Sequence, residues 1–545
     1  MTTHALEATG RVARPLNDFE IEPLLADLAG AHQGKRSVKK RIRAFESAWA
    51  RLQADEPGYV QSPEDASLEL DLNNWHRFHN SMLIGEAIPL AYRYLLHNPA
   101  APARTEFSHI LIDEFQDLNK AEQGVLHLLS DNANVCIVGD DDQSIYSFKH
   151  AHPEGIRQWL AANGGGVDVE LGECHRCPSQ VVAMANALIA RNLDRPVRRA
   201  LTPRPQNGPG EIQIIQYTTL AEEIQGVANL IQALVTAGTH PGDILVLAQR
   251  GVIGSPIYQT LSAMGIPARS YYAESELDSE DAQERFAKLK LYVDREDRVA
   301  LRWLLGLGHN GWHARAYQRL RLHCEEQGLT PWVVLERLSR GIDSIPHTAA
   351  IVERFQRVAA ELEQLEMLTS VTEVIDSLFP AENAGLQGLR AVALEASLLA
   401  NGDRRTFLAE LSSLIAKPEV PTEVTNVRIM SLHKSKGLSA PVTIIAGCIQ
   451  GLLPRLPEAD LPATEMQSQM EEQRRLLYVG ITRVKAAPQL GKPGRLVLTC
   501  SQQMPLASAM QAGIQPAYSR FGTAHLVASQ FLNEFGQTAP RAIRG

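Results

Sequence analysis

The chain has 545 residues, of which 44% are hydrophobic and 21% are charged, with a formal net charge of −9 at pH 7. This composition excludes a disordered chain and is typical of a globular protein with several compact domains. No apolar stretch reaches the about 18–20 residues that a membrane span requires, and the first twenty residues contain no hydrophobic signal core. Six cysteines are too few for a disulfide framework, so we expect a cytoplasmic protein without a membrane partner.

The first 105 residues are predicted to be mostly helical, with amphipathic segments at residues 38–52 and 80–96. The most basic run of the chain, residues 35–43, fits either a solvated helix face or a surface that contacts phosphates, and the solvated face is favoured. The negative net charge does not exclude nucleic acid, because binding requires only a local groove of lysines and arginines.

From residue 107 the pattern changes to a buried strand at 107–113, a helix at 120–129 and a second buried strand at 133–139. Nearly continuous apolar runs that alternate with helices predict a parallel sheet covered on both faces. After a Pro/Gly-rich linker or turn at 202–210, further strands are expected, with a helix at 222–235 and a helical insertion at about 285–424. These strands are predicted at residues 211–217, 243–249, 426–432, 441–446 and 495–501.

The stretch HILIDEFQD, residues 109–117, ends an apolar strand on acidic and amide groups. Ligands of open α/β folds bind at the carboxyl ends of the strands, where Asp113 and Glu114 are expected to emerge. One carboxylate is suited to hold Mg²⁺ and the next to orient and deprotonate a water molecule. A helix N-cap is the alternative explanation for this pair taken alone.

A second run, residues 136–148 (CIVGDDDQSIYSF), again ends a strand on acidic and amide groups. The aspartates at positions 140–142 repel one another unless a cation or basic groove lies close. Gln143 is suited to bridge a terminal phosphate to a moving element. Tyr146 and Phe148 are spaced to present ring faces to unpaired bases, although such aromatic residues more often belong to a core.

These two runs resemble motifs II and III of the UvrD/Rep-type superfamily-1 DNA helicases. Three further stretches resemble motifs IV, V and VI and follow in the order of the family: LGECHRCPS at 171–179, VRIMSLHKSKGL at 427–438 and EEQRRLLYVGITR at 471–483. The resemblance covers roughly residues 70–535, ending near SQFLNE. A chance match of five ordered motifs is negligible.

The resemblance implies a role for each matching position. Asp113 would hold Mg²⁺, Glu114 would be the catalytic base and Gln143 the phosphate sensor. Arg176 and Arg483 would act on the γ-phosphate of ATP as arginine fingers, which increase rates by about 10³–10⁵ where they occur. The remaining implied positions are His175 in place of an adenine-stacking tyrosine, Gly437 in the nucleotide site, and Tyr146, Phe148 and His433 against single-stranded DNA. Ser439 replaces the family's glutamate, which puts that nucleotide contact in doubt.

The resemblance also implies the fold class and the activity. We expect an α/β protein with two RecA-like parallel-sheet domains, the first of them incomplete, and helical insertions. The expected activity is that of an ATP-dependent 3′→5′ DNA helicase or translocase acting on single-stranded or forked DNA. The expected parts are residues 1–105 (insertion 1B), 106–170 (domain 1A), 171–284 (domain 2A, first part), 285–424 (insertion 2B), 425–505 (domain 2A, second part) and 506–545 (tail).

The glycine-rich phosphate loop that the family places before motif II is not found. The candidate GAHQGKRS at residues 30–37 has a glycine spacing one residue too short, Arg36 in place of a metal-binding hydroxyl and no strand before it. Without that loop, ATP affinity should be lost, and the strand at 135–138 should have an unpaired apolar edge. We therefore expect a truncated or split helicase that needs a phosphate-loop segment in trans.

Three alternatives remain beside this hypothesis. The first is a catalytically inactive helicase-like module that binds single-stranded DNA or protein partners. A metal-dependent nuclease is less favoured, because no second carboxylate constellation is present. A zinc site at Cys174 and Cys177 is not favoured either, because no second pair of matching spacing exists.

Overall fold

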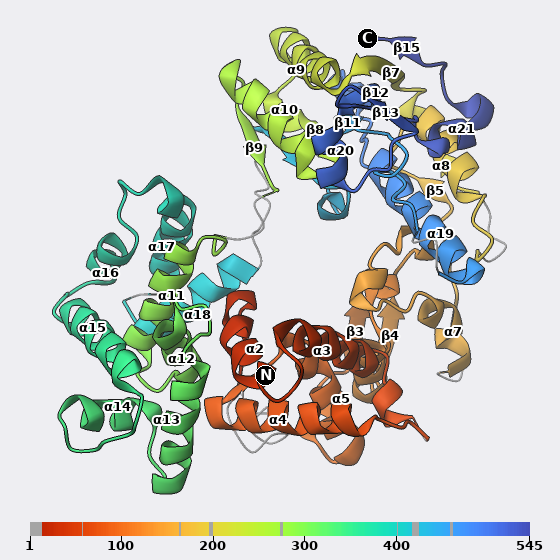
Figure 1. The fold of residues 1–545 in the computed structure, drawn as a ribbon. Coiled ribbons are helices and arrows are strands. Elements are labelled where there is room, and N and C mark those ends of the chain that lie inside the picture. Colours follow the sequence, from red (N-terminus) through yellow and green to blue (C-terminus); the bar gives the residue numbers. More distant parts are fainter. Residues whose placement is uncertain are drawn as a thin grey trace. The chain divides into compact units, whose positions relative to one another are not determined.

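A computed structural model describes residues 13–56, 58–162, 165–195, 200–272, 276–400, 402–416, 424–457 and 461–545. The chain divides into two compact units, each built from segments that are distant in sequence. Unit 1 comprises Met1–Leu111, Asn119–Cys136 and Glu274–Val420, and unit 2 comprises Ile112–Leu118, Ile137–Ala273 and Pro421–Gly545. Figure 1 shows the elements of both units, coloured along the chain.

Unit 1 is almost entirely helical. Among the residues described, its only strands are β1 (Arg14–Pro15) and β2 (Ser81–Met82), which pair in parallel, and the first residues of β3 and β4, which both end in unit 2. Its helices are α2 (Ile21–Ala29), α3 (Lys35–Ala50), α4 (Pro63–His79), α5 (Ala87–His97), α6 (Lys120–Leu129), α11 (Glu280–Val293), α12 (Arg298–Gly306), α13 (Ala314–Gln327), α14 (Pro331–Ser339), α15 (Ala349–Glu366), α16 (Val371–Leu378), α17 (Gln387–Leu399) and α18 (Arg404–Ala416).

The N-terminal helices and the helices after α10 share their cores within unit 1. Phe19 and Phe78 are buried among the side chains of α11–α18, and Val299 of α12 is buried among those of α2–α4. The rings of Phe19 and Trp303 meet edge to face with centroids 5.3 Å apart. The two helical segments that the sequence suggests as separate insertions therefore form one packed body. The division of the chain into six parts stays a prediction.

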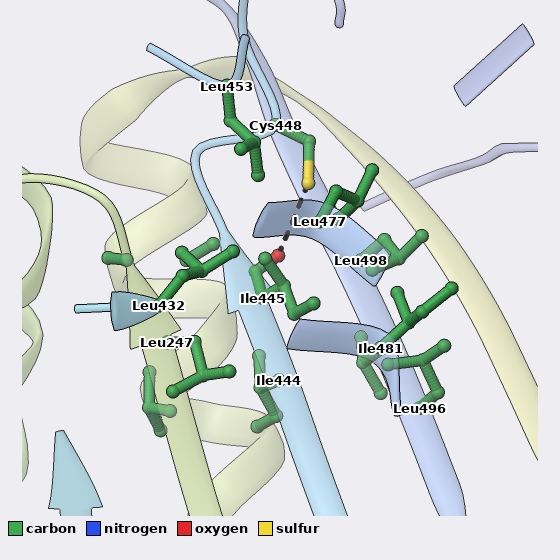
Figure 2. Packing of buried hydrophobic residues seen from close by; sticks show 14 of the residues in the cluster. Leu247, Leu432, Ile444, Ile445, Cys448, Leu453, Leu477, Ile481, Leu496 and Leu498 are labelled. Carbon is green, nitrogen blue, oxygen red and sulfur yellow. Dashed lines mark hydrogen bonds between the residues drawn. The ribbon is translucent and has the colours of Figure 1, made fainter. Parts of the chain in front are cut away.

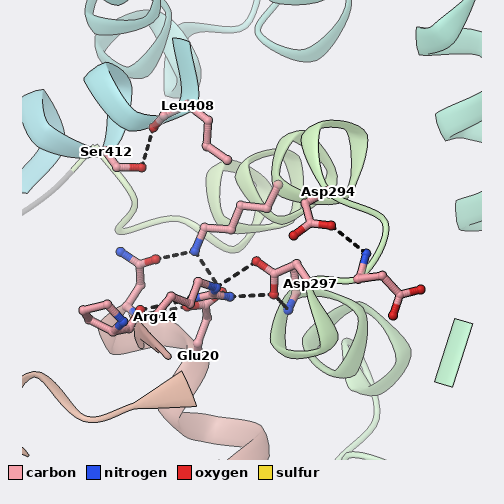
Figure 3. Close-up of polar contacts among 11 residues, drawn as sticks. Arg14, Glu20, Asp294, Asp297, Leu408 and Ser412 are labelled. Carbon is pink, nitrogen blue, oxygen red and sulfur yellow. Dashed lines mark hydrogen bonds and ion pairs between the residues drawn. The ribbon is translucent and has the colours of Figure 1, made fainter. Parts of the chain in front are cut away.

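A largely buried network of charges joins these two segments (Figure 3). The Arg14 guanidinium donates to Glu20 and to Asp297, at 2.8 Å in each case, and Lys290 Nζ donates to Glu20 Oε1 at 2.9 Å. Burial alone would raise the pKa of Glu20, but the positive charges of Arg14 and Lys290 outweigh it and lower the pKa to about 2. Glu20 is therefore a buried carboxylate that stays ionised.

Unit 2 is built on a nine-stranded sheet in the residues described. Along the order β13-β14-β12-β11-β8-β10-β9, the strands pair in parallel except at β12–β14 and β13–β14, and β7 also pairs in parallel with β12 and β15. The strands are β7 (Glu211–Thr219), β8 (Ile244–Ala248), β9 (Ala268–Ser270), β10 (Val427–Met430), β11 (Val442–Ala446), β12 (Arg495–Pro505), β13 (Tyr518–Arg520), β14 (Thr523–His525) and β15 (Ile543–Arg544), with β5 (Glu173–Cys174) and β6 (Thr202–Pro203) as a separate pair.

The central strands of this sheet are apolar because helices cover both of its faces. Every residue of β8 and β11 is buried, as expected for parallel strands that are covered on both sides. Figure 2 shows Leu477 and Ile481 of α19 against Leu496 and Leu498 of β12 in this core. The helices of unit 2 are α7 (Glu154–Ala162), α8 (Ser179–Ile189), α9 (Leu220–Thr236), α10 (Gly251–Ala263), α19 (Ala463–Ile481), α20 (Leu506–Ala512) and α21 (Gln530–Glu534).

The strands that carry motifs II and III differ from the prediction. β3 (His109–Ile112) and β4 (Asn134–Ile137) form where they were expected, but they are not buried, and Leu111 is 81% exposed. The reason is that, within the described ranges, β3 and β4 pair only with each other. The prediction of a sheet covered on both faces is therefore wrong for these strands, whereas the prediction of an exposed apolar edge at residues 135–138 fits them.

The other predicted elements agree with the structure within a few residues. α6 has the predicted bounds, the predicted helix 222–235 lies in α9, and the strands predicted after residue 210 correspond to β7, β8, β10, β11 and β12. The predicted helix 80–96 is shorter, because residues 81–82 form β2 before α5 begins at Ala87. None of the helices in the described part of the chain is long and apolar enough to cross a membrane.

Candidate functional site

The loops that follow β3 and β4 are joined by a buried amide. Glu114 adopts a left-handed backbone conformation with φ 53°, which is unusual for a residue other than glycine and is found at functional sites. Gln116 Nε2 donates to Glu114 Oε2 at 2.6 Å, and its Oε1 accepts from the backbone N–H of Asp140 at 3.0 Å. Because Gln116 is fully buried, it fixes the motif II carboxylate relative to the motif III loop.

The consecutive aspartates of motif III are neutralised by arginines rather than left to repel one another. Asp142 accepts two-pronged hydrogen bonds from Arg195, the shortest at 2.8 Å, and Asp141 lies 3.3 Å from Arg157. Burial opposes charge at such positions, and an arginine at bonding distance compensates for it. The basic neighbours of Asp141 and Asp142 are therefore side chains of the chain itself, whereas Asp140 accepts a hydrogen bond from the Gln143 amide.

Lys436 of motif V connects motifs II and III, and sequence reasoning missed it. Its Nζ donates to Asp117 at 2.6 Å and to the backbone carbonyl of Gln143 at 2.9 Å, and it lies 3.4 Å from Glu114. Burial raises the pKa of Asp117, against the opposing effect of the Lys436 charge. A signal for Lys436 was present in the sequence, because Lys436 lies between His433 and Gly437, two positions that the resemblance already implies in the site.

The side chains of Gln143 and Asp113 form hydrogen bonds within their own loops. The Gln143 side-chain amide donates to Asp140 Oδ2 at 2.9 Å, so its position is set by its own loop. Asp113 is exposed at the end of β3, and its Oδ1 accepts from the backbone N–H of Glu114 at 2.8 Å. In the described residues no group of three or more His, Cys, Asp or Glu side chains could hold a metal ion unaided. A lone carboxylate of this kind fits Mg²⁺, which usually keeps several waters and phosphate oxygens as ligands.

The two arginines predicted as fingers differ in their surroundings. Arg483 is 1% exposed, and its guanidinium donates to the backbone carbonyls of Val479 at 2.8 Å and Leu438 at 3.2 Å. Its burial and the neighbouring charge of Arg176 lower the pKa of Arg483 to about 10, while Glu114 acts in the opposite direction. Arg176 is exposed. Arg483 thus lies close enough to Arg176 and to Glu114 for the charge of each to act on it.

His175 and Gly437 lie in open surroundings. The His175 ring is exposed and lies 3.3 Å, Nδ1 to Nη1, from Arg204. Gly437 has φ +80°, a conformation that side chains rarely adopt, and an added Cβ would meet nothing within 4 Å. The Ser439 carbonyl accepts from Arg428 at 3.3 Å, and within the described residues the Ser439 hydroxyl forms no hydrogen bond.

The three residues predicted to contact DNA form one aromatic cluster. Phe148 lies edge to face with Tyr146 at 5.6 Å and with His433 at 5.7 Å between ring centroids. The Tyr146 hydroxyl donates to the His433 carbonyl at 3.2 Å, and Lys149 Nζ lies 4.8 Å from the centre of the Tyr146 ring. Phe148 is 62% exposed, so its ring is open to a ligand, and Lys149 places a cation over the neighbouring Tyr146 ring.

These observations define a protein of the RecA-like α/β class, with its polar groups gathered in the loops at the strand ends. The UvrD-like helicase C-terminal domain matches residues 169–488, more than half of the chain, and the UvrD/REP helicase N-terminal domain matches residues 70–161. The chain therefore belongs to the UvrD-like helicase family.

Named relatives agree with this assignment. The chain is 28% identical over 401 residues to DNA helicase II of Haemophilus influenzae, and the aligned region covers 70% of this chain and 54% of that protein. It is 26% identical over 506 residues to the ATP-dependent DNA helicase UvrD1 of Mycobacterium leprae, and this aligned region covers 82% of this chain and 63% of that protein. The chain thus spans a little more than half the length of these curated relatives.

Proposed function

We propose that this chain acts in an ATP-driven DNA helicase or translocase that moves 3′→5′ along single-stranded or forked DNA. The observation that carries the proposal is the position of Lys436, which bonds to motifs II and III while its near neighbour His433 belongs to the aromatic cluster. The candidate hydrolytic groups and the candidate DNA-stacking groups are thus joined through one short turn, His433–Ser435.

In the proposed reaction, each side chain has one task. Gln116 holds Glu114 so that its carboxylate orients the attacking water and accepts its proton. Asp113 would hold Mg²⁺, which would neutralise charge on the phosphates of ATP. Arg176, whose exposed side chain has no partner among the described contacts, would reach the γ-phosphate, and Arg483 would act on it from a buried position, where its guanidinium donates to the Val479 carbonyl. Gln143 would sense the terminal phosphate and pass its position to Lys436 through its own backbone carbonyl.

We further propose that activity requires a phosphate-loop segment that completes the sheet of β3 and β4, supplied in trans where this chain is a separate polypeptide. No stretch of the printed sequence has the spacing Gly-x₄-Gly-Lys-Ser/Thr. The exposed side chains of Leu111 and Val138 support the proposal, because an added strand with its following helix would cover apolar residues of β3 and of the end of β4. That segment would supply the N–H groups and the lysine that cradle phosphates.

ATP hydrolysis by the purified chain, alone and mixed with a peptide or domain carrying the phosphate-loop segment, tests the proposal. We expect hydrolysis that is stimulated by single-stranded DNA only in the mixture, and its loss in the Glu114→Gln variant. Glu465→Gln, an exposed glutamate at the start of α19, is the matched control and should retain full activity. Full hydrolysis by the chain alone would contradict the need for a partner, and no hydrolysis in the mixture would contradict the enzymatic proposal.

The direction of movement has its own test. Single strands labelled at the 5′ or the 3′ end report arrival of the protein at that end. The mixture is expected to change the signal of the 5′ label first, and the opposite order would contradict 3′→5′ movement.

A second candidate function is that of a catalytically inactive module that binds single-stranded DNA or a protein partner through the surface around Phe148. It is favoured by the missing phosphate-loop pattern together with the exposed ring of Phe148. Under this function, Glu114→Gln should leave DNA binding unchanged and no added segment should produce hydrolysis.

A further inference from the structure

Two cysteines flank the motif IV residues His175 and Arg176. Cys174 ends the strand β5, and Cys177 lies two residues before α8 begins at Ser179. The chain bends over residues 175–177, which brings the half-buried thiol of Cys174 and the buried thiol of Cys177 within hydrogen-bonding reach of each other. Cys-x-x-Cys occurs once in the printed sequence.

The pKa values of the two thiols differ from that of an ordinary thiol in opposite directions. The hydrogen bond from Cys177, with help from the backbone N–H groups of Cys177 and Arg176, lowers the pKa of Cys174 to about 6. The same pairing, together with burial, raises the pKa of Cys177 well above its ordinary value. An accessible thiolate beside a protonated, shielded thiol is the arrangement in which the first sulfur attacks and the second resolves.

The loop around the pair is held independently of any bond between the sulfurs. Asn207 Nδ2 donates to the backbone carbonyls of His175 at 3.1 Å and Cys177 at 3.0 Å, and the Ala486 N–H donates to the Arg176 carbonyl at 2.8 Å. The Cys177 thiol lies 3.5 Å from the Thr482 carbonyl, next to Arg483. This scaffold keeps the two sulfurs together, which favours reaction between them over reaction with a more distant thiol.

We propose that Cys174 and Cys177 form a redox-active dithiol that a low-molecular-weight disulfide oxidises reversibly to a disulfide across motif IV. The Cys174 thiolate attacks one sulfur of the small disulfide, forms a mixed disulfide and expels the first small thiolate. Cys177 loses its proton to solvent and attacks the Cys174 sulfur, which forms the Cys174–Cys177 bond and expels the second small thiolate. Two protein thiols are oxidised, and one small disulfide is reduced to two thiols.

The disulfide would change the surroundings of both predicted arginine fingers. It closes a ring that contains His175 and Arg176, and it removes the Cys177 thiol from the Thr482 carbonyl beside Arg483. We expect oxidation to restrain Arg176 and so to slow any hydrolysis in which it takes part. This consequence rests on the proposed function, whereas the thiol chemistry does not.

The chemistry is tested on the full chain by incubation in glutathione buffers of increasing oxidised fraction. The remaining thiols are then blocked by alkylation, and the peptides are identified by mass spectrometry. The expected product is an internal Cys174–Cys177 disulfide, which a reductant reverses. Cys136, an exposed cysteine outside any such pair, is the matched control and should form only a mixed disulfide with glutathione.

Variants separate the attacking role of Cys174 from the resolving role of Cys177. Cys177→Ser should trap glutathione on Cys174, and Cys174→Ser should abolish reaction at Cys177. Cys177→Ala serves the same purpose if the serine variant does not fold, and circular dichroism checks the fold of each. A pair that stays reduced while Cys136 is glutathionylated would overturn the proposal, as would a Cys174 disulfide to any other protein cysteine.

The pH dependence of alkylation gives a second readout. Between pH 6 and pH 8, the alkylation rate of Cys174 should rise about twofold, because the thiol is already about half ionised at pH 6. An ordinary thiol with a pKa of about 8.5 should react about 80-fold faster at pH 8 than at pH 6. A rise at Cys174 as steep as that of a small free thiol would contradict the proposed nucleophile.

Discussion

Replacement of Glu20 by glutamine should destabilise unit 1 by about 3 kcal/mol at pH 7. The pKa of Glu20 falls from its ordinary value of 4.5 to about 2 in the folded chain. Each pKa unit between the folded and unfolded states corresponds to about 1.4 kcal/mol, which gives about 3 kcal/mol. Removal of one partner from a buried ion pair costs about 3–5 kcal/mol, a consistent value, because the remaining charges of Arg14 and Lys290 lose their shared anion.

The pH dependence of this stabilisation has a definite sign. A carboxylate whose pKa is lowered by folding stabilises the folded state fully above its unfolded pKa, and it loses that stabilisation as the pH falls toward its folded pKa. For Glu20 the loss should occur between about pH 5 and pH 2. The Glu20→Gln variant cannot ionise at this position, so its stability should lack this part of the acid dependence.

Urea unfolding followed by tryptophan fluorescence measures both effects. Five of the six tryptophans lie in unit 1, and Trp303 contacts the Phe19 ring beside Glu20. Glu325→Gln is the matched control, because Glu325 forms an exposed pair with Arg321 one helical turn away, which should contribute less than about 0.5 kcal/mol. A loss below about 1 kcal/mol for Glu20→Gln, or acid profiles of wild type and variant that run parallel, would refute the reasoning.

Three further predictions concern unit 2. Phe148→Ala should weaken single-strand binding about 5- to 150-fold in fluorescence anisotropy, since base stacking contributes about 1–3 kcal/mol, while the exposed control Phe107→Ala should not change it. Phe115→Ala should lower the free energy of unfolding of unit 2 by about 3–5 kcal/mol in urea titrations followed by circular dichroism, because Phe115 is fully buried against Trp159; a loss under 1 kcal/mol would contradict this. Burial raises the pKa of Glu223, so the folded state binds its proton more tightly than the unfolded state and stability falls as the pH rises above about 4.5. Glu223→Gln should lack that fall and be no less stable than wild type at pH 7 in the same titration, and a variant less stable by more than about 1 kcal/mol would contradict it.

The local parts of the candidate site could be predicted from the sequence because their geometry is set within a few residues. A strand that ends on Asp113 and Glu114 must present them at the strand end, and the short spacing of Tyr146 and Phe148 keeps their rings together. The contact of these rings with His433 was predictable only through the family resemblance, since nearly 290 residues separate them.

Other features could not be predicted because they depend on partners that no local pattern identifies. Arg14 and Asp297 are separated by 283 positions, and nothing in either neighbourhood specifies the other. The burial of β3 and β4 was misjudged for a related reason. An apolar run such as Ile110–Leu111 indicates a strand, but whether that strand is covered depends on which other segments pack on it.

The Arg14 network is better explained by specificity than by stability. It pairs two cations, Arg14 and Lys290, with two anions, Glu20 and Asp297, so its formal charge is balanced; Glu20 and Lys290 are buried, and Arg14 is partly exposed. Burial of such charges costs free energy that well-packed apolar residues of similar size would not, so such a network rarely increases net stability. The charges do, however, select one way for the segment before α2 to pack. If that segment were shifted by even one residue, a buried charge would lose its partner, which costs free energy. The apolar surfaces of Phe19 and Phe78 tolerate small shifts, and the charges do not. We infer that apolar burial holds the two segments of unit 1 together, while the ion network determines the single register in which they meet.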